Sequence, residues 1–362
     1  MHALTPKRIV VWGTGNVGRP AIRAIVAHKD LQLAGVIVSN PAKVGRDAGA
    51  IAGIADTGII ATSDAETLLR AGGIDAVVYA ANADLRPQES FAELLLCLRS
   101  GANVVSTAFY PLLYPATTPP EIRALVDAAC AEGDSSVFVS GIDPGWALDM
   151  LPIVLSGVVA DIREIRCQEI FDYATYDQPE VVRNVIGFGK PMDELPMMLS
   201  DFALRMVWEP MVRLVGDGLG RPVEAIEVAV ERRPLQRSID VPGMGRFEAG
   251  TQGAFRFEVR GLVAGRALYV AEHVTRIDDT CAPDWPYPPE GRGCHRVIIK
   301  GSPDLHVTIH GEDAHEPGPA GGGNTTAANR LVNALPAVCA ARAGIITPLD
   351  LPTINGGRQL RG

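Results

Sequence analysis

Three glycines in the segment from Lys7 to Gly18, which reads KRIVVWGTGNVG, are spaced as G-x-G-x-x-G between a short apolar run and a helical pattern. In a dinucleotide-binding turn the first glycine allows a tight turn. The second lets the backbone approach a pyrophosphate, and the third packs the helix on the sheet. The spacing predicts a dinucleotide site, with a merely structural turn as the alternative. The residues of this predicted site are Gly13, Thr14, Gly15, Asn16, Val17 and Gly18.

The end of the second predicted strand distinguishes the two pyridine dinucleotides. An acidic residue there would bind the ribose 2′-hydroxyl of NAD. This chain instead has Ser39 and Asn40, followed by Lys43 and Arg46, with no carboxylate before Asp47. A hydroxyl and two cations suit a 2′-phosphate, so the sequence favours NADP(H), with NAD(H) as the alternative. The competing interpretation is a solvated loop with ordinary surface cations.

Two further loops follow predicted strands, at the edge of the sheet where a dinucleotide binds. In the first, Ala81 is small enough to let the chain pass close to the cofactor, and Asn82 would contact the cofactor or cap the next helix. The second loop contains Phe109, which we expect to line the substrate pocket near the nicotinamide.

Asp143 and Trp146 lie in the segment SGIDPGW, which ends the last strand of the N-terminal region. Asp143 is a candidate for proton transfer. An aspartate followed by Pro144 is also typical of a helix start, with the aspartate as N-cap and the proline in the first helical position, so both interpretations stay open. We expect Trp146 to form part of an apolar pocket.

Ionisable and aromatic residues gather from Glu169 to Tyr176. Hydride transfer to a C=O or C=N bond needs a positioned acid to protonate the heteroatom, or a base in the reverse direction. Tyr173 is the first candidate for this role, followed by Tyr176 and Asp143. The alternative is that such residues form turns or pack with one side in water.

Phe171 and Phe188 complete the predicted pocket, although core packing is the default explanation for aromatic and methionine residues in helical patterns. If they line the site, the substrate is largely apolar. No metal is predicted, because the histidines show no tight ligand spacing such as H-E-x-x-H. His273, on a predicted strand, is interpreted as a residue of a sheet face.

Two predicted domains position these residues. In residues 1–150, short β-branched runs alternate with helical patterns, which predicts an α/β fold with a doubly wound parallel Rossmann sheet. Residues 151–323 predict a second α+β domain with an open, mainly antiparallel sheet, because Phe255, Phe257 and Val259 alternate with charged residues. We expect helices over 180–188 and 194–215 in this domain. A Gly-rich mobile loop is expected over 311–324, and then, within 324–362, a helix that returns to the first domain, followed by an extended tail.

Composition limits the possible functions. The 362 residues are 47% hydrophobic and 21% charged, which suits folded domains rather than disorder. The formal net charge of −9 argues against nucleic-acid binding and against an anionic membrane surface as partner. With no secretion signal and no CxxC pair among its six cysteines, the chain is predicted to be cytoplasmic.

Several segments together resemble the dihydrodipicolinate reductase-like superfamily, most of all the branch of 2,4-diaminopentanoate dehydrogenase and the native amine dehydrogenases. They are VVWGTGNVGRPAIRAI, SNPAKVGRDAG, NVVSTAFYPLLYP, GIDPGWALDMLP, EIFDYATYDQPE, EHVTRIDDTCAPDWP and RLVNALPAV. The resemblance implies a Rossmann domain that binds NAD(P)H, an α+β domain with the substrate cleft and the subunit contact, and a homodimer.

Two departures from the family pattern narrow the activity. The His-His and Lys signature of dihydrodipicolinate reductases is replaced by Phe171-Asp172-Tyr173, which argues against that activity. Characterised amine dehydrogenases carry a glutamate in the loop after the strand ending at Val105, whereas this chain has Ala108-Phe109-Tyr110. Because such a glutamate would hold ammonia and stabilise an iminium, its absence argues against ammonia-dependent amination.

The sequence therefore predicts an NAD(P)H-dependent oxidoreductase that acts on a C=O or C=N carbon of a small, largely apolar substrate, as an amine dehydrogenase or as a carbonyl or imine reductase. The alternative is a dinucleotide-sensing protein that has kept the fold and lost catalysis.

Overall fold

The computed structural model describes residues 5–176 and 178–360. The described chain divides into two compact units. The first unit falls within residues 1–142 and 324–362, and the second within residues 143–323. Each unit contains its own six-stranded sheet.

The sheet of the first unit has the strand order β14-β5-β4-β3-β1-β2, and every pair in it is parallel. Its strands are β1 (Lys7–Trp12), β2 (Leu31–Ile37), β3 (Ala76–Tyr79), β4 (Asn103–Ser106), β5 (Ser136–Val139) and β14 (Gly344–Ile346). Strand β1 pairs with β2 on one side and with β3 on the other, so the strand order reverses at β1. This confirms the predicted doubly wound sheet. Strand β14 was not predicted.

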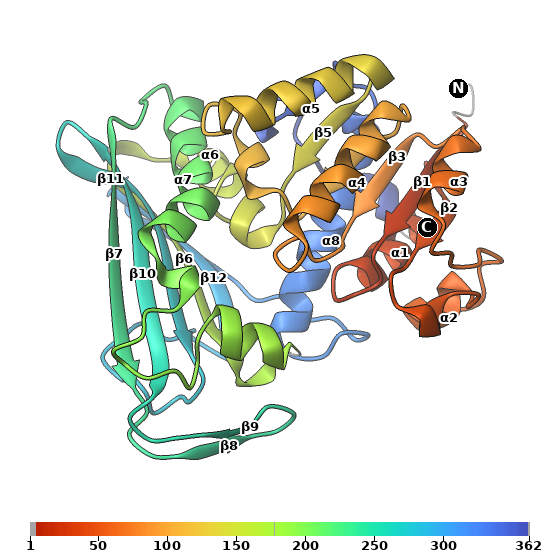
Figure 1. Ribbon diagram of the computed structural model, residues 1–362. Helices are drawn as coiled ribbons and strands as arrows, with labels where there is room; N and C mark the ends of the chain where they lie inside the picture. Colours follow the sequence, from red (N-terminus) through yellow and green to blue (C-terminus); the bar gives the residue numbers. More distant parts are fainter. Residues whose placement is uncertain (1–4, 177, 361–362) are drawn as a thin grey trace. The chain divides into compact units, whose positions relative to one another are not determined.

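Helices cover both faces of this sheet (Figure 1). They are α1 (Gly18–Ala27), α2 (Ala48–Ala52), α3 (Ala65–Arg70), α4 (Pro87–Arg99), α5 (Pro120–Gly133) and α8 (Pro319–Val338). Buried residues of α1 and α8, such as Ile22 and Leu335, form one core cluster with Ile9 and Val11 of β1. Helices α4 and α5 lie side by side on the other face. Buried side chains on both faces explain why these strands read as continuous apolar runs.

The sheet of the second unit has the order β13-β12-β6-β11-β10-β7. Its strands are β6 (Ala160–Asp172), β7 (Ala225–Pro234), β10 (Gln252–Val263), β11 (Arg266–Arg276), β12 (Gly293–Ser302) and β13 (Leu305–Ile309). Only β11 and β6 pair in parallel, which confirms the predicted, mainly antiparallel sheet. Helices α6 (Met150–Ser156) and α7 (Asp201–Gly218) contact this sheet, and Figure 1 shows α7 in front of it.

The alternation on β10 separates two different faces. Phe255 and Phe257 are buried, and the ring of Phe257 packs on Trp208 of α7 at 4.6 Å between centroids. The opposite face is drier than predicted, because Glu258 is also buried. Its carboxylate accepts hydrogen bonds from Arg166 at 2.7 Å and Arg256 at 2.9 Å. A buried carboxylate needs such partners to offset the loss of water.

Two helices predicted for the second unit are shorter or displaced. A single irregular turn at Val181–Val185 replaces the helix over 180–188. The helix predicted over 194–215 begins only at Asp201, where Ser200 caps α7 by accepting from the N–H of Ala203. A two-stranded hairpin of β8 (Ile239–Val241) and β9 (Gly245–Phe247), not predicted, extends from the end of the sheet (Figure 1).

The predicted C-terminal boundary of the loop over 311–324 is wrong, because α8 begins at Pro319 and includes Gly321, Gly322 and Gly323. A Cβ atom on Gly321 would lie 1.9 Å from the carbonyl oxygen of Glu316, and one on Gly322 would lie 1.8 Å from that of Gly311. Close packing of the preceding chain, rather than a need for chain flexibility, explains these two glycines.

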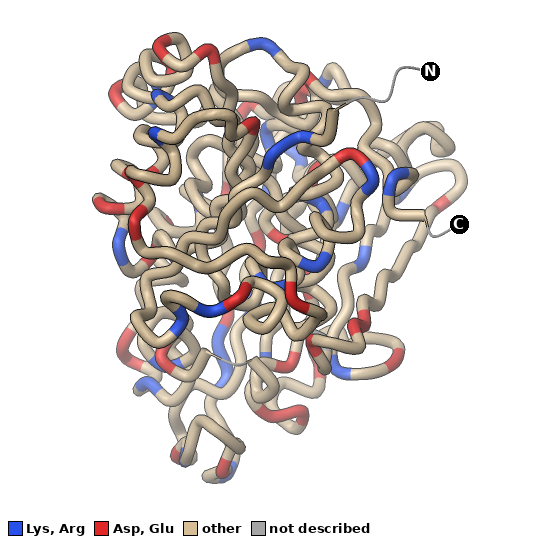
Figure 2. Tube along the Cα trace, turned by 90° about the vertical axis from the view of Figure 1, so that its right-hand side faces the viewer, with Lys and Arg blue, Asp and Glu red and all other residues tan. Residues whose placement is uncertain are grey.

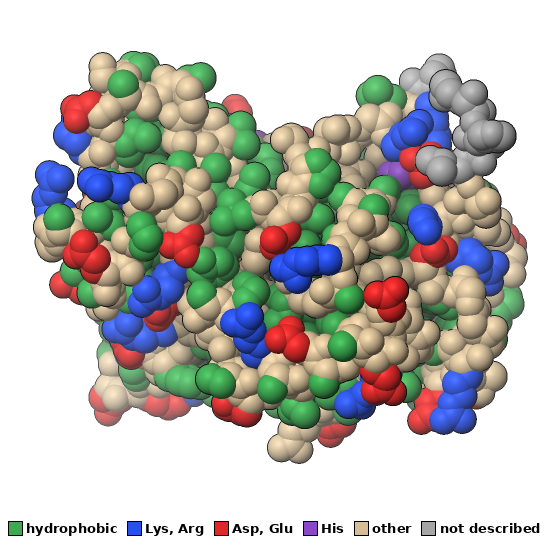
Figure 3. Space-filling view, turned by 90° about the horizontal axis from the view of Figure 1, so that it is seen from above, with side chains coloured by type: hydrophobic (Ala, Val, Ile, Leu, Met, Phe, Trp, Pro, Cys, Tyr) green, Lys and Arg blue, Asp and Glu red, His purple; other side chains and the backbone are tan. Residues whose placement is uncertain are grey.

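Charges of both signs are interspersed along the described trace (Figure 2). The view from above shows the same mixture, with hydrophobic side chains between the charged ones (Figure 3). Among residues 5–176 and 178–360, none of the helices combines the length and apolar character needed to cross a bilayer.

Candidate functional site

The glycine turn of the first unit separates structural from functional glycines. Gly13 has a positive φ of 96°, and a Cβ atom on it would lie 2.7 Å from the backbone nitrogen of Ala81. A Cβ atom on Gly18 would lie 1.9 Å from the carbonyl oxygen of Gly13. Gly15 is different, because a Cβ atom there would meet nothing within 4 Å. Packing within the protein therefore explains Gly13 and Gly18, and the space at Gly15 fits a backbone that a pyrophosphate approaches.

Helix α1 begins directly after this turn and presents an uncapped N-terminus. Its N-cap residue Val17 makes no side-chain hydrogen bond, and its first turn contains no acidic residue. The dipole of a helix favours negative charge at its N-terminus. The turn and the helix together fit the diphosphate of a dinucleotide.

A cationic group lies beside the turn, after β2. The Nζ atom of Lys43 donates to the carbonyl oxygen and to Oγ1 of Thr14, at 2.9 and 3.0 Å. Burial lowers the pKa of Lys43, and the positive charges of Arg19 and Arg46 lower it further. A phosphate dianion would relieve this repulsion. Arg19 was not among the predicted binding residues, although it directly follows Gly18.

The nearest carboxylate in sequence, Asp47, is already engaged. It caps α2 through the N–H of Gly49 and also accepts from the N–H groups of Thr57 and Gly58. These hydrogen bonds lower the pKa of Asp47, with that from Thr57 the largest contribution. Asp47 is therefore tied to its own loop, and its carboxylate is not free for the ribose 2′-hydroxyl of NAD.

The remaining predicted cofactor residues lie on nearby loops of the first unit. Ser39 is exposed, and Asn40 accepts from the N–H of Ala42 as the cap of a single helical turn. The backbone of Ala81 lies against Gly13, and the predicted contact of Ala81 with the cofactor stays a prediction. Asn82 accepts from the N–H groups of Asp84 and Leu85, so its side chain shapes a turn. The alternative that Asn82 caps the next helix is wrong, because the N-cap of α4 is Arg86 and α4 has no side-chain cap.

Phe109 adopts a left-handed conformation, with φ of 63°, that is unusual for a residue with a side chain. Its ring packs against Tyr79 at 5.1 Å, and Tyr79 packs against Trp12 at 5.7 Å. Three aromatic side chains therefore gather at the carboxyl ends of β1 and β3 and in the loop after β4. Strained residues in such positions are common at ligand sites.

In the second unit, ionisable residues of three neighbouring strands form one row. Glu169 of β6 is directly opposite His273 of β11 and, on its other side, directly opposite His295 of β12. Residues opposite each other in register point to the same face of a sheet. The row continues with Phe257 of β10, whose ring stacks on His273 at 4.6 Å.

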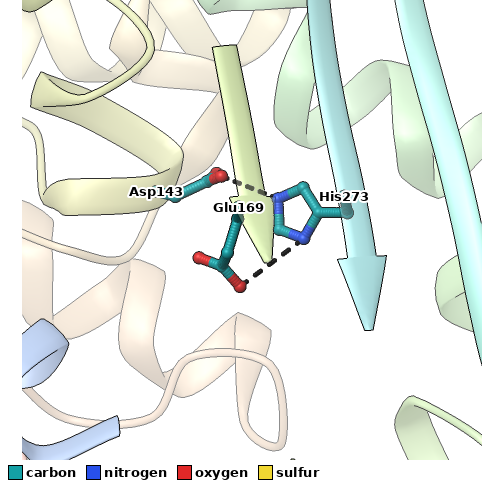
Figure 4. Close-up of side chains that lie close together, drawn as sticks. All are labelled: Asp143, Glu169 and His273. Carbon is teal, nitrogen blue, oxygen red and sulfur yellow. Dashed lines mark ion pairs between the residues drawn. The ribbon is translucent and has the colours of Figure 1, made fainter. Parts of the chain in front are cut away.

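Asp143 joins this row from the segment before α6. Its Oδ2 atom lies 2.7 Å from Nε2 of His273, although the two atoms do not have the alignment of a linear hydrogen bond. Its Oδ1 atom accepts from Nε1 of Trp208 at 2.9 Å. Figure 4 shows Asp143 and Glu169 on different nitrogens of the same ring. The interpretation of Asp143 as a helix cap is wrong, because Asp149 caps α6 instead.

Glu169 has three contacts, each longer than the two contacts of Asp143. Its Oε1 atom is 3.6 Å from Nδ1 of His273 and accepts from the hydroxyl of Tyr173 at 3.3 Å. Its Oε2 atom is 3.2 Å from Nε2 of His295. In the part of the chain that the structure describes, the ion-pair partners of Asp143 and Glu169 are histidines, and neither carboxylate pairs with a lysine or an arginine.

These contacts determine the ionisation of the cluster. Burial lowers the pKa of His273, but the carboxylates of Asp143 and Glu169 outweigh burial and leave the pKa raised. Burial raises the pKa of Tyr173 well above its usual range, and the charge of Glu169 adds to this effect. His273 therefore favours the imidazolium form, and Tyr173 keeps its proton at neutral pH.

The side chains of Asp143, Glu169 and His273 also resemble a set of metal ligands, because one possible ligand atom of each lies within 4.8 Å of those of the other two. However, the two carboxylates approach opposite nitrogens of the imidazole. A single ion binds only one nitrogen of a histidine ring. The arrangement is that of neighbouring proton donors and acceptors.

The predicted pocket residues differ in their surroundings. Phe188 is fully buried and contacts Tyr173 and Phe255, so it packs in the core. Phe171 lies beside the ring of His295 at 5.2 Å. Trp146 is partly exposed, in the irregular segment that carries Asp143. Tyr176 stacks on Tyr173 at 5.0 Å between ring centroids.

Sequence reasoning did not single out Glu169, His273 or His295 as site residues. His273 was interpreted as a residue of a sheet face, which is where it lies, but the sequence did not show which strands flank it. The one available signal was that Glu169 and His273 fall on predicted strands and that His295 directly precedes a plausible one. Their pairing comes from the strand order alone.

Comparisons with known proteins cover both units. Residues 146–358 match the family model described as the 2,4-diaminopentanoate dehydrogenase C-terminal domain. The chain belongs to this family. Residues 7–109 match the model described as dihydrodipicolinate reductase, N-terminus. The resemblance found in the sequence is therefore confirmed, and family membership makes the chain an NAD(P)-dependent oxidoreductase with a small-molecule substrate.

Individual relatives of the family cover nearly the whole chain. It is 52% identical to an amine dehydrogenase from Streptomyces virginiae, over 95% of each chain. It is 23% identical to a 2,4-diaminopentanoate dehydrogenase from Acetoanaerobium sticklandii, over 95% of this chain and 93% of the other. The structure of an amine dehydrogenase from Mycobacterium smegmatis shares the fold, with a TM-score of 0.74 at 22% identity over 99% and 100% of the two chains.

Proposed function

We propose that this protein interconverts a small, largely apolar amine and its carbonyl counterpart, with NADP(H) as the preferred dinucleotide. Bound NADP(H) would accept the hydride from the amine carbon or supply it in the reverse direction. The glycine turn and the N-terminus of α1 would hold the diphosphate. Lys43, Arg46 and Arg19 would bind the 2′-phosphate.

The observation that carries the choice of an amine is the charge of the buried cluster. Asp143 and Glu169 contribute two carboxylates, and the imidazolium of His273 offsets one of them. With no lysine or arginine partner for either carboxylate among the described residues, the cluster favours one further positive charge. An ammonium or iminium group carries that charge, whereas an alcohol or ketone does not.

The test is NADPH oxidation by the purified protein with a panel of aliphatic ketones and aldehydes, with and without ammonium. Turnover that requires ammonium supports the proposal. Ketone reduction that ammonium does not change would show a carbonyl reductase. Tight NADPH binding in calorimetry, without turnover on any ketone, aldehyde or imine, would show a sensing protein instead.

We also propose that the chain acts as a cytoplasmic homodimer, with residues 151–323 carrying the substrate site and the subunit contact. The family resemblance of this region supports the dimer, and the six cysteines, all free, support the location. Sedimentation of the purified protein tests the dimer, because a monomer at all concentrations would contradict it.

A further inference from the structure

The two buried carboxylates of the second unit are not equivalent. The side chain of Asp143 has no exposed surface, Oδ1 accepts from the indole N–H of Trp208, and Oδ2 lies 2.7 Å from Nε2 of His273 without hydrogen-bond alignment. A carboxylate in this state has no room for a substrate. It faces Nε2 of the His273 imidazolium and so orients the ring with its Nδ1 toward Glu169, as second carboxylates orient histidines at other sites.

Glu169 has the opposite character. Its contacts with His273, Tyr173 and His295 are between 3.2 and 3.6 Å, at or beyond the upper end of strong hydrogen bonds to a carboxylate. Its side chain retains 11% of its exposure, against 0% for Asp143. Glu169 is therefore the carboxylate of the cluster that a ligand can reach, and its present partners leave room for a stronger donor.

The groups around Glu169 suit a cationic nitrogen with an apolar body. His273 and His295 flank the carboxylate in register, Phe171 lies beside His295, and the hydroxyl of Tyr173 donates to Oε1. Because Tyr173 keeps its proton, it acts as a donor to Glu169 and not as a base. Glu169 is then the acceptor of the cluster that can take a proton from the substrate.

We propose that Glu169 is a catalytic residue that binds the substrate nitrogen and exchanges its proton, and that Asp143 and His273 position it. This inference rests on the proposed amine chemistry and names the group that performs it. His295 holds the second carboxylate oxygen, so that the carboxylate presents one oxygen to the nitrogen.

In the direction of amination, Glu169 carries protons from the nitrogen to the carbonyl oxygen. Ammonium gives one proton to Glu169, and the resulting ammonia forms a C–N bond with the carbonyl carbon. Glu169 returns this proton to the former carbonyl oxygen, which becomes a hydroxyl. Glu169 then takes a second proton from the nitrogen of the adduct and passes it to the hydroxyl, the C–O bond breaks, and water and an iminium ion form. Bound NADPH would supply the hydride that converts the iminium carbon into the amine carbon. Glu169 ends as the carboxylate in which it began.

The test compares Glu169→Gln with the wild type and with Glu164→Gln, a control on the same strand that pairs with Arg166 and lies outside the row. For Glu169→Gln we expect kcat/KM for ammonium to fall by roughly 100-fold or more, with the dissociation constant for NADPH unchanged. Glu164→Gln should behave as the wild type.

A binding experiment without turnover provides a second readout. Calorimetry with a primary alkylamine and with the matching alcohol should show that Glu169→Gln loses affinity for the amine only. Glu169→Asp keeps the charge but shortens its reach, so it should raise KM for ammonium more than it lowers kcat. This variant also serves as the test if the amide variant does not fold.

The possible failures are distinguishable. If the wild type shows no turnover that depends on ammonium, the proposed function is wrong. If the wild type does show it, and Glu169→Gln keeps amine affinity and the ammonium dependence, the function stands and the role of Glu169 is wrong.

Discussion

His273 of β11 lies directly opposite Glu169 of β6, with its Nδ1 atom 3.6 Å from the Oε1 atom of the glutamate. The other nitrogen of the same ring faces Asp143, and the ring packs on Phe257 and Trp208. A parallel pair of strands inside a mainly antiparallel sheet therefore brings an imidazole between two carboxylates. The contact with Phe257 and Trp208 fixes the plane of the ring.

The ionisation of His273 predicts a pH-dependent stability. Because the pKa of His273 is raised in the folded state, its contribution to the free energy of unfolding is fully present below the ordinary value of 6.5 and is lost as the pH rises through the raised pKa. Urea unfolding from about pH 6 to about pH 9 should show a steeper loss of stability in the wild type than in His273→Gln. Removal of the exposed His306 by His306→Gln is the control. Equal slopes for the wild type and His273→Gln would contradict the prediction.

Tyr173→Phe tests whether the tyrosine is a base or a donor. The hydroxyl donates to Glu169, and the raised pKa keeps its proton in place, so we expect a loss of kcat of roughly 10-fold, as for one hydrogen bond to a charged group. The basic limb of the pH profile should stay where it is. Tyr176→Phe, which keeps the stacked ring, is the control. Complete loss of turnover in Tyr173→Phe would contradict the donor role and indicate that Tyr173 itself transfers the proton.

The cations beside the glycine turn predict the dinucleotide preference. Arg46→Ala should weaken NADPH binding by roughly 10-fold, equivalent to about 1.4 kcal/mol, and leave NADH binding nearly unchanged. Lys43→Ala should weaken both dinucleotides, because Lys43 also holds Thr14 of the turn. Calorimetry with both nucleotides measures the effect, and Lys29→Ala is the control. Equal weakening of both nucleotides by Arg46→Ala would contradict the 2′-phosphate site.

Gly293 supports the aromatic wall beside His295. A Cβ atom on Gly293 would lie 2.5 Å from Cδ1 of Phe171, so the ring must move if alanine is introduced. Gly293→Ala should cost about 1–3 kcal/mol of stability and raise KM for the carbonyl substrate. Gly323→Ala is the matched control, because a Cβ atom there meets nothing within 4 Å. A Gly293→Ala variant as stable and as active as the control would show that Phe171 does not shape the site.

The first unit was largely predictable because its information is local. The strand, the three glycines and the following helix are contiguous, and each later strand follows the helix that connects it. Lys43 and Arg46 could be identified because they follow the second predicted strand closely in the sequence. Asp47 could not be interpreted in this way, because its partners Thr57 and Gly58 come from a loop whose return to α2 leaves no mark in the sequence.

The cluster of the second unit was predictable only in part. Asp143 and Tyr173 were identified from residue type and position, but Glu169, His273 and His295 acquire their meaning from the register of three strands that are distant in the chain. Alternation predicts that a segment is a strand. It does not show which strand lies beside it, and here a parallel pair forms where antiparallel neighbours were expected. The loop after Val105 lacks a carboxylate, and the sequence alone did not reveal that the second unit brings two carboxylates to one imidazole.

Isotope transfer tests the central claim most directly. The protein is incubated with NADPH deuterated at C4 of the nicotinamide, an aliphatic ketone and ammonium labelled with heavy nitrogen, and the product is analysed by mass spectrometry. The account predicts an amine that carries the heavy nitrogen and one deuterium on the adjacent carbon. An alcohol that carries the deuterium and no nitrogen, formed at the same rate without ammonium, would contradict it.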